Sequence, residues 1–231
     1  MLKDTETTEF LGLCTEPYAI MMQYSCFNFA IFGADSSVSS LADFLQFVDT
    51  EYNFLSFSEV LPVCVKDIVT GLDYLHSHNV AHRDLKPGNI LVCNQHLPNS
   101  SDDTVLGKAY QACPIVCRLS DFGLSRSVDV QTKSVLTSKT TSISCGMPVY
   151  MAPEIHLNQL VMAGQEDLRR ADMWSLGLVM HAMLNPDLCS PYRTELMQTA
   201  SVDPQVELRN IMAKRQLPQH SSKYEQLRIS T

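Results

Sequence analysis

The chain has 231 residues, of which 45% are hydrophobic and 18% are charged, and its formal net charge is -8. This length is enough for one sizeable core or for a large piece of a two-lobed domain. The negative balance argues against a nucleic-acid surface or an anionic-membrane surface, because both collect Lys and Arg. It does not exclude ATP, whose phosphates need only a few local cations.

The sequence carries no signal for export or for a structural metal. Residues 1–6 are largely polar and acidic where a signal peptide would be apolar, and no apolar run is long enough to span a bilayer. The eight cysteines contain no C-x-x-C pair, and Cys113 and Cys117 have no partner pair for a tetrahedral zinc site. We therefore expect reduced thiols and a cytoplasmic protein.

The first elements are a hairpin and a helix. Two apolar stretches at residues 10–14 and 18–22 are separated by Thr-Glu-Pro, which predicts a short β-hairpin. Residues 41–48 have apolar positions three and four apart, which predicts a short helix.

The most regular pattern in the chain is helical and runs from residue 61 to residue 79. His76 and His78 are interpreted only as the end of this helix. Short β-like segments follow at residues 80–81, 90–92 and 116–119.

The later elements alternate between loops and helices. The connection at residues 93–114 is polar and far longer than a normal hairpin loop, so it predicts an exposed insertion. Residues 125–144 are rich in Ser and Thr and predict a mobile loop. Helices are predicted at residues 172–184 and 206–214, and residues 216–231 show no clear period.

Four short motifs follow one another in a fixed order. They are HRDLKPGN at residues 82–89, DFG at 121–123, APE at 152–154 and DMWSLG at 172–177. A single tripeptide of this kind is weak evidence, but the four motifs together, in the expected context of strands and helices, are specific. The set resembles the protein kinase family over residues 10–191, and the form Asp84-x-Lys86 is typical of its serine/threonine members.

The resemblance implies an α+β, protein-kinase-like fold, with a mostly α-helical large lobe and a remnant of the small β lobe. The chain would then be a partial kinase domain over residues 1–231. Residues 10–25 would form the small-lobe remnant and hinge, residues 26–191 the large lobe, and residues 192–231 a C-terminal segment without assignment.

The motif residues suit phosphoryl transfer, which depends on in-line geometry and on screening of developing charge. Asp84 would accept the proton of a substrate hydroxyl, and Lys86 would neutralise the γ-phosphate. Asn89 and Asp121 would offer oxygen ligands to Mg²⁺. The expected cofactors are ATP and Mg²⁺, and the expected partner is a protein substrate, with no nucleic acid and no membrane; a regulatory partner protein is also compatible.

By the same resemblance, four residues would contact the nucleotide. Met22 stands at the gatekeeper position, the backbones of Gln23 and Ser25 would face adenine, and Leu91 would lie beneath it.

Other motif residues would support the site. His82 and Phe122 resemble members of an apolar stack, and Asp172 would brace the catalytic loop from below. Arg83 adjoins Asp84, an arrangement typical of kinases activated by a phosphate that an arginine grips. The candidate phosphorylation sites are Ser134, Thr137, Ser138, Thr140, Thr141, Ser142 and Ser144.

The chain also departs from the family's pattern. It contains no G-x-G-x-x-G, and Lys3, the only lysine before the hinge, is too close to residue 10 to be the phosphate lysine. The pattern therefore begins near the fourth strand of the small lobe. Met147 stands where a threonine is usual, which we expect to lower turnover, and no arginine after Pro191 has the context to pair with Glu154.

Three interpretations follow. The first is a serine/threonine kinase reading frame whose isolated chain is impaired. The second is a pseudokinase-like binding or scaffold module without catalysis. The third is an unrelated binding module with coincidental motifs, which predicts no helical large lobe and no effect of nucleotide on stability.

Overall fold

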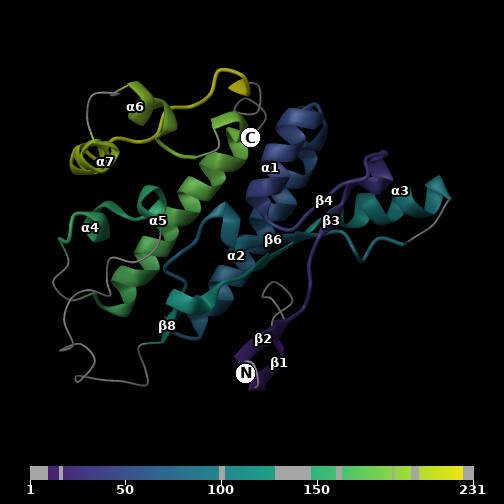
Figure 1. The fold of residues 1–231 in the computed structure, drawn as a ribbon, viewed down its shortest axis with the longest axis horizontal. Coiled ribbons are helices and arrows are strands. Elements are labelled where there is room, and N and C mark those ends of the chain that lie inside the picture. The colour runs from purple at the N-terminus through teal and green to yellow at the C-terminus, as the bar shows by residue number, and fades with distance from the viewer. Residues whose placement is uncertain are drawn as a thin grey trace. The chain divides into compact units, whose positions relative to one another are not determined.

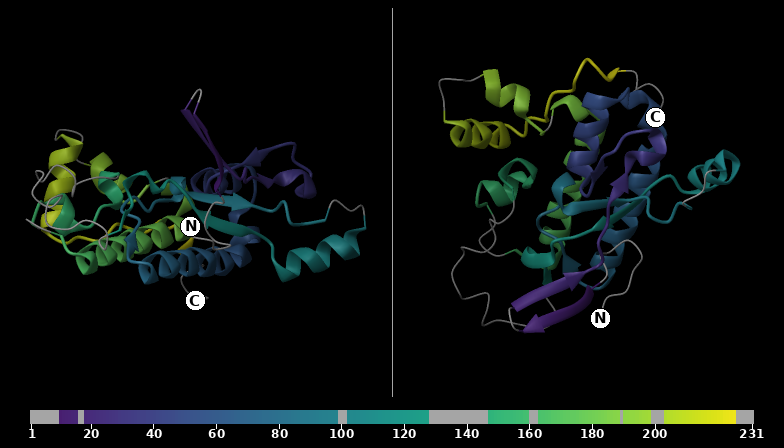
Figure 2. Two further views of the ribbon diagram at one scale, coloured as in Figure 1. Left: turned by 90° about the horizontal axis from the view of Figure 1, so that it is seen from below. Right: turned by 45° about the vertical axis from the view of Figure 1, so that its right-hand side comes forward.

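The computed structural model describes residues 10–15, 18–98, 102–127, 147–159, 163–188, 190–198 and 203–225. The described residues form two compact units. The first is drawn from the ranges 1–74 and 87–120, and the second from 75–86 and 121–231. Figure 1 traces the elements along the chain, and Figure 2 shows them from two further directions.

The described strands are short and pair in twos, each pair antiparallel: β1 with β2, β3 with β4, β5 with β8 and β6 with β7. Their bounds are β1 (Phe10–Thr15), β2 (Tyr18–Met22), β3 (Phe27–Asn28), β4 (Ser37–Val38), β5 (Val80–Ala81), β6 (Ile90–Cys93), β7 (Val116–Leu119) and β8 (Arg126–Ser127).

Helices account for most of the regular structure. Within the described ranges none is both long and apolar enough to cross a bilayer. The α-helices are α1 (Leu41–Glu51), α2 (Leu61–Ser77), α3 (Asp103–Ala112), α4 (Pro153–His156), α5 (Gln165–Leu184), α6 (Arg193–Gln198) and α7 (Pro204–Ala213).

The predicted N-terminal hairpin is confirmed. Strands β1 and β2 pair from Thr15 opposite Tyr18 to Gly12 opposite Met21. The hairpin projects from the rest of the first unit in Figure 1 and Figure 2. Two apolar side chains of β1 are accordingly exposed, Leu11 by 58% and Leu13 by 62%.

The first unit is organised around an aromatic core. Phe29 lies 5.9 Å from Phe44 of α1 and 6.3 Å from Phe57, measured between ring centroids. Helix α1 confirms the predicted helix and extends three residues beyond it. Ser40 caps its N-terminus by accepting the Asp43 N–H at 3.1 Å.

The predicted helix at residues 61–79 and the predicted segments at 90–92 and 116–119 are confirmed as α2, β6 and β7. A carboxylate ties α2 to β7, because Asp67 Oδ2 accepts the Cys117 N–H at 2.9 Å. Burial is the main cause that raises the pKa of Asp67 above 3.8, and the Cys117 N–H opposes it.

The predicted insertion contains a helix that the sequence analysis missed. Asp102 begins α3 by accepting the Thr104 N–H at 2.9 Å. Tyr110 attaches the helix to the first unit, since its ring lies 5.8 Å from that of Phe32 and its hydroxyl is hydrogen-bonded to Glu59. Most of the other described α3 side chains are exposed, as predicted for an insertion.

The second unit is built on α5, the long green helix of Figure 1. It begins at Gln165, seven residues before the predicted start. Asp167 Oδ2 accepts the Gly164 N–H at 2.9 Å, and the acidic residues Glu166 and Asp167 suit the positive N-terminal end of the helix. The first two turns carry few apolar residues, so the apolar period did not reveal them.

The C-terminal region of the second unit is ordered without an apolar period. Helix α7 confirms the predicted helix at residues 206–214 within two residues at its start. Beyond it, the main chain of Gln219 donates to Glu195 Oε1 at 2.7 Å, and its carbonyl is 2.9 Å from His181 Nε2. Polar side chains therefore fix a segment that the sequence left unassigned.

The predicted mobile loop at residues 125–144 lies mostly outside the described residues. Its first residues are described, and there β8 pairs with β5, with Arg126 opposite Ala81. All seven candidate phosphorylation sites are outside the described ranges.

Candidate active site

One buried carboxylate organises the loop that contains Asp84. Asp172, on α5 and 1% exposed, accepts the N–H of His82 on Oδ2 and the N–H of Arg83 on Oδ1, both at 2.8 Å. This confirms the predicted brace. His76 lies in the last turn of α2, as predicted, and the same Oδ2 lies 2.9 Å from its Nε2, a contact that the sequence pattern did not reveal.

The brace explains an unusual backbone. Arg83 has a φ of 70°, a left-handed conformation that costs a residue with a Cβ roughly 1–2 kcal/mol. Two hydrogen bonds from consecutive amides to one carboxylate offset this cost. The Arg83 side chain donates from Nη1 to the Leu124 carbonyl at 3.2 Å.

The structure brings Asp84 and Lys86 into contact. Asp84 is 8% exposed, and its Oδ2 lies 2.7 Å from Lys86 Nζ. Its Oδ1 accepts the main-chain N–H of Met147 at 3.0 Å. The identity of the side chain at position 147 gives no sign of this link, which any residue except proline can make.

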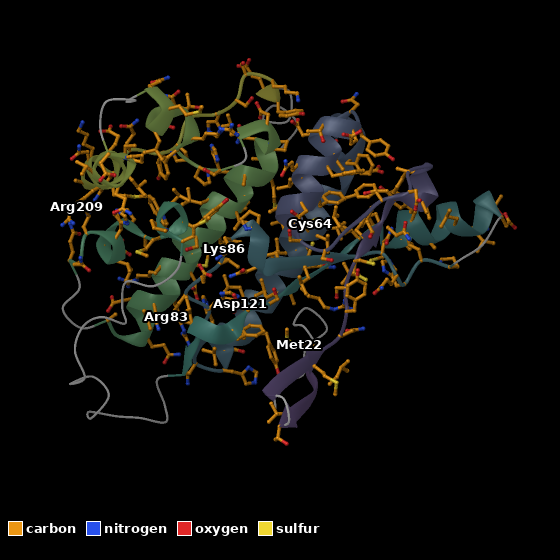
Figure 3. All side chains as sticks on the ribbon, viewed as in Figure 1. Met22, Cys64, Arg83, Lys86, Asp121 and Arg209 are labelled. Atoms are coloured by element: carbon orange, nitrogen blue, oxygen red, sulfur yellow. The ribbon has the colours of Figure 1, made fainter. Side chains whose placement is uncertain are left out.

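Asp121 belongs to the same unit as Asp84 and Lys86; Figure 3 labels Lys86 and Asp121. Its side chain is exposed, and its φ of 60° is left-handed. The next residue, Phe122, has its ring 5.5 Å from that of His82, which confirms that these two predicted stack members meet.

Asn89 and Leu91 lie in the first unit. Asn89 is 7% exposed, and its main-chain carbonyl accepts both the N–H and the hydroxyl of Ser120 at 2.9 Å. Leu91 on β6 pairs with Arg118 on β7, and Arg118 Nη1 donates to Ser25 Oγ at 3.4 Å. Ser25 and Leu91, both predicted to contact adenine, therefore neighbour the same arginine.

The other predicted hinge residues precede Ser25. Met22 ends β2 with 50% of its surface exposed and is labelled in Figure 3, and Gln23 follows it. Their contact with a nucleotide remains a prediction.

Two of the predicted site residues carry oxygen donors of the type that suits a hard cation. Asn89 of the first unit has an amide oxygen, and Asp121 of the second unit has an exposed carboxylate. Mg²⁺ is typically held by one or two such oxygens together with substrate phosphates. Within the described part of the chain, no three His, Cys, Asp or Glu side chains cluster as an all-protein metal site would require.

The structure also places an arginine near the APE motif, where the sequence analysis found none in a matching context. Glu154 and Arg215 line the same cavity of about 210 Å³, together with Trp174 of α5. Among the described residues these two charges are not within ion-pair distance of each other. Arg215 follows α7 with a left-handed φ of 52°.

The braced HRD loop, the contact between Asp84 and Lys86, and the DFG turn define the site of a protein kinase. The family model of the protein kinase domain matches residues 34–229. The chain belongs to this family, and its mainly helical α+β fold is the fold that the sequence predicted.

Several curated proteins that the chain matches are named as protein kinases. A probable myosin light chain kinase of Dictyostelium discoideum is 33% identical over 120 residues, which is 52% of this chain and 26% of the relative. A MAP kinase-interacting serine/threonine-protein kinase of Xenopus laevis is 33% identical over 126 residues, 52% of this chain and 22% of the relative. A calcium/calmodulin-dependent protein kinase of Emericella nidulans is 35% identical over 120 residues, 52% of this chain and 23% of the relative. The matched part spans about a quarter of the length of these relatives.

Proposed function

We propose that the chain carries the catalytic residues for phosphoryl transfer from ATP to a serine or threonine hydroxyl of a protein substrate. The observation that carries this proposal is the pairing of the nearly buried Asp84 carboxylate with the Lys86 ammonium at 2.7 Å. A carboxylate beside an ammonium supports the proposal, because a hydroxyl that attacks a phosphate requires a proton acceptor and a nearby cation.

In the proposed mechanism, Asp84 accepts the proton of the substrate hydroxyl, and Lys86 neutralises charge on the transferred phosphate. Asp172 holds the loop that presents both side chains. Asn89 and Asp121 would hold Mg²⁺, which when bound supplies charge neutralisation on the phosphates. None of these side chains forms a covalent bond to the substrate in this mechanism.

Four residues of the first unit are proposed to bind the nucleotide. Ser25 and Leu91 would contact adenine together with Gln23, and Met22 would border the base. Their support is the resemblance to the family and the shared contact of Ser25 and Leu91 with Arg118. The division into a small-lobe remnant at residues 10–25, a large lobe at 26–191 and a C-terminal segment is likewise a proposal.

We further propose that the 231-residue polypeptide by itself is slow. Its sequence contains no G-x-G-x-x-G and no lysine in position to grip the α- and β-phosphates. Positioning supplies much of the rate of phosphoryl transfer, so ATP would be held less precisely. A module that binds nucleotide or protein without transfer is the alternative that the following experiment separates.

The test is transfer of the γ-phosphate to a library of serine- and threonine-containing peptides, with Asp84→Asn as the variant. We expect this substitution to lower the rate about 100-fold or more, because it removes the general base while keeping the shape. The matched control is Asp73→Asn on the exposed face of α2. Equal rates for wild type and Asp84→Asn would refute the proposal, and ATP binding without transfer in both would favour the binding module.

A further inference from the structure

Both oxygens of the Asp84 carboxylate are engaged by donors. Oδ2 meets the ammonium of Lys86 at 2.7 Å, and Oδ1 accepts the Met147 N–H at 3.0 Å. Two donors, one on each oxygen, restrict the orientation of the carboxylate. The orientation of the proposed base therefore depends on position 147 as well as on its neighbour Lys86.

At position 147 the main-chain N–H, and not the side chain, donates the hydrogen bond to Asp84. A methionine side chain has no hydrogen-bond donor, and that of Met147 is 48% exposed. Its carbonyl accepts the Tyr150 N–H at 3.0 Å, and the Tyr150 carbonyl accepts the Ser175 hydroxyl at 2.8 Å. Because Ser175 lies on α5, the amide of Met147 is anchored to the helix that also carries Asp172.

We propose that the main-chain N–H of Met147 is a positioning group for phosphoryl transfer. It holds Asp84 Oδ1, while Lys86 holds Oδ2, so that the carboxylate keeps one orientation toward the substrate hydroxyl. The main chain thereby supplies a link to the carboxylate that the side chain of a methionine cannot make. This inference rests on the proposed function.

A proline at position 147 tests the inference with little other change. Met147 has φ -77° and ψ 121°, a conformation that proline adopts, and the preceding residue in the sequence is Gly146, which has no Cβ to clash with the ring. Met147→Pro therefore deletes the N–H. Met147→Ala is the matched reference, because it removes the side chain and keeps the N–H.

We expect kcat to be about tenfold lower in Met147→Pro than in Met147→Ala, which is less than the 10²–10⁴-fold that a general base contributes in full, because the variant keeps the base and changes only its orientation. The KM for ATP should be similar in the two variants, since the donor contacts Asp84 only. If Met147→Pro and Met147→Ala have equal kcat values while Asp84→Asn abolishes activity, the inference is wrong. The proposed function would still be supported by that result.

Hydrogen exchange provides a second measurement that needs no catalytic activity. In protein labelled with ¹⁵N-methionine, the Met147 signal is identified as the one missing from Met147→Ala. We expect its amide to exchange about tenfold faster in Asp84→Ala than in wild type, and Asp73→Ala to leave it unchanged. If wild type transfers no phosphate, the proposed function fails; an exchange rate insensitive to Asp84→Ala would overturn the inference in either case.

Discussion

At the scale of single residues, the site depends on a buried carboxylate that is not itself a candidate for chemistry. Asp172 accepts two main-chain hydrogen bonds and a third contact from His76. An ionised group that is 1% exposed is stable only when its oxygens are satisfied, and here the partners are the amides of the catalytic loop. The charge of Asp172 and the strained backbone of Arg83 therefore support each other.

Replacing Asp172 by alanine should lower the free energy of unfolding by about 3 kcal/mol, because two buried amides would lose their acceptor. Urea denaturation followed by circular dichroism measures this change. Asp73→Ala, on an exposed position of α2, should change it by less than about 0.5 kcal/mol. A loss below about 1 kcal/mol for Asp172→Ala would show that the loop is held mainly by other contacts.

At the scale of elements, polar contacts fix the register between neighbouring elements, which apolar packing alone would not specify. Asp67 fixes β7 on α2 through the Cys117 N–H, and Tyr110 fixes α3 on the aromatic core of the first unit. Each contact is directional, so it specifies one register where apolar packing would permit several. Both contacts can be tested separately.

The contact of Asp67 predicts a pH-dependent stability. Burial raises the folded-state pKa of this carboxyl above 3.8, so its unfavourable ionisation costs stability as the pH rises from 3.8 through the folded-state pKa. Asp67→Asn keeps an oxygen for the Cys117 N–H and cannot ionise. Its stability relative to wild type should therefore be greater at about pH 7 than at about pH 3.5.

Urea denaturation at the two pH values measures this difference. Asp67→Ala is the companion variant, because it also removes the ionisation but leaves the Cys117 N–H without its acceptor. It should be less stable than Asp67→Asn by about 1–3 kcal/mol at both pH values. A difference between Asp67→Asn and wild type that does not vary with pH would contradict the assignment.

The contact of Tyr110 predicts that α3 can be released locally. The pKa of Tyr110 is raised to about 12 by burial and by Glu59, which indicates a hydroxyl held in a poorly solvated position. Tyr110→Ala should increase amide exchange at residues 104–112, and Tyr110→Phe should increase it less. Val105→Ala, at a side chain that is 45% exposed, should leave exchange nearly unchanged; equal exchange in all three variants would show that α3 is held by other groups.

At the scale of the whole molecule, the chain divides into two units that share a helix. The boundary at residues 74 and 75 falls inside α2, which is continuous from Leu61 to Ser77. Unfolding either unit would break hydrogen bonds of this helix, which favours a single cooperative transition.

Because both units include part of α2, we expect two spectroscopic probes to report the same unfolding curve. Trp174 is the only tryptophan and belongs to the second unit, so its fluorescence reports that unit, whereas far-ultraviolet circular dichroism reports both. We expect coincident midpoints in urea. A tryptophan transition displaced from the circular dichroism transition would show that the units unfold separately.

The strongest sequence signals concerned local pattern. The hairpin at the start, the long helix before the HRD motif and the pair of strands around Leu91 could be predicted because apolar period and turn residues are local properties. The beginning of α5 and the whole of α3 could not, since both are polar segments stabilised by caps at Gly164 and Asp102. Candidate residues such as Asp84 came from motif order, and their roles stay predictions.

The sequence by itself determined the family, because the order and spacing of HRD, DFG, APE and the Asp172 motif are covalent facts. Only the tertiary structure decided which groups meet. The amide of Met147 lies 63 residues from Asp84 along the chain, and His76 lies 96 residues from Asp172. The type of residue does not reveal a main-chain donor, because every residue except proline has an N–H. Partners so distant in the sequence are brought together only by folding.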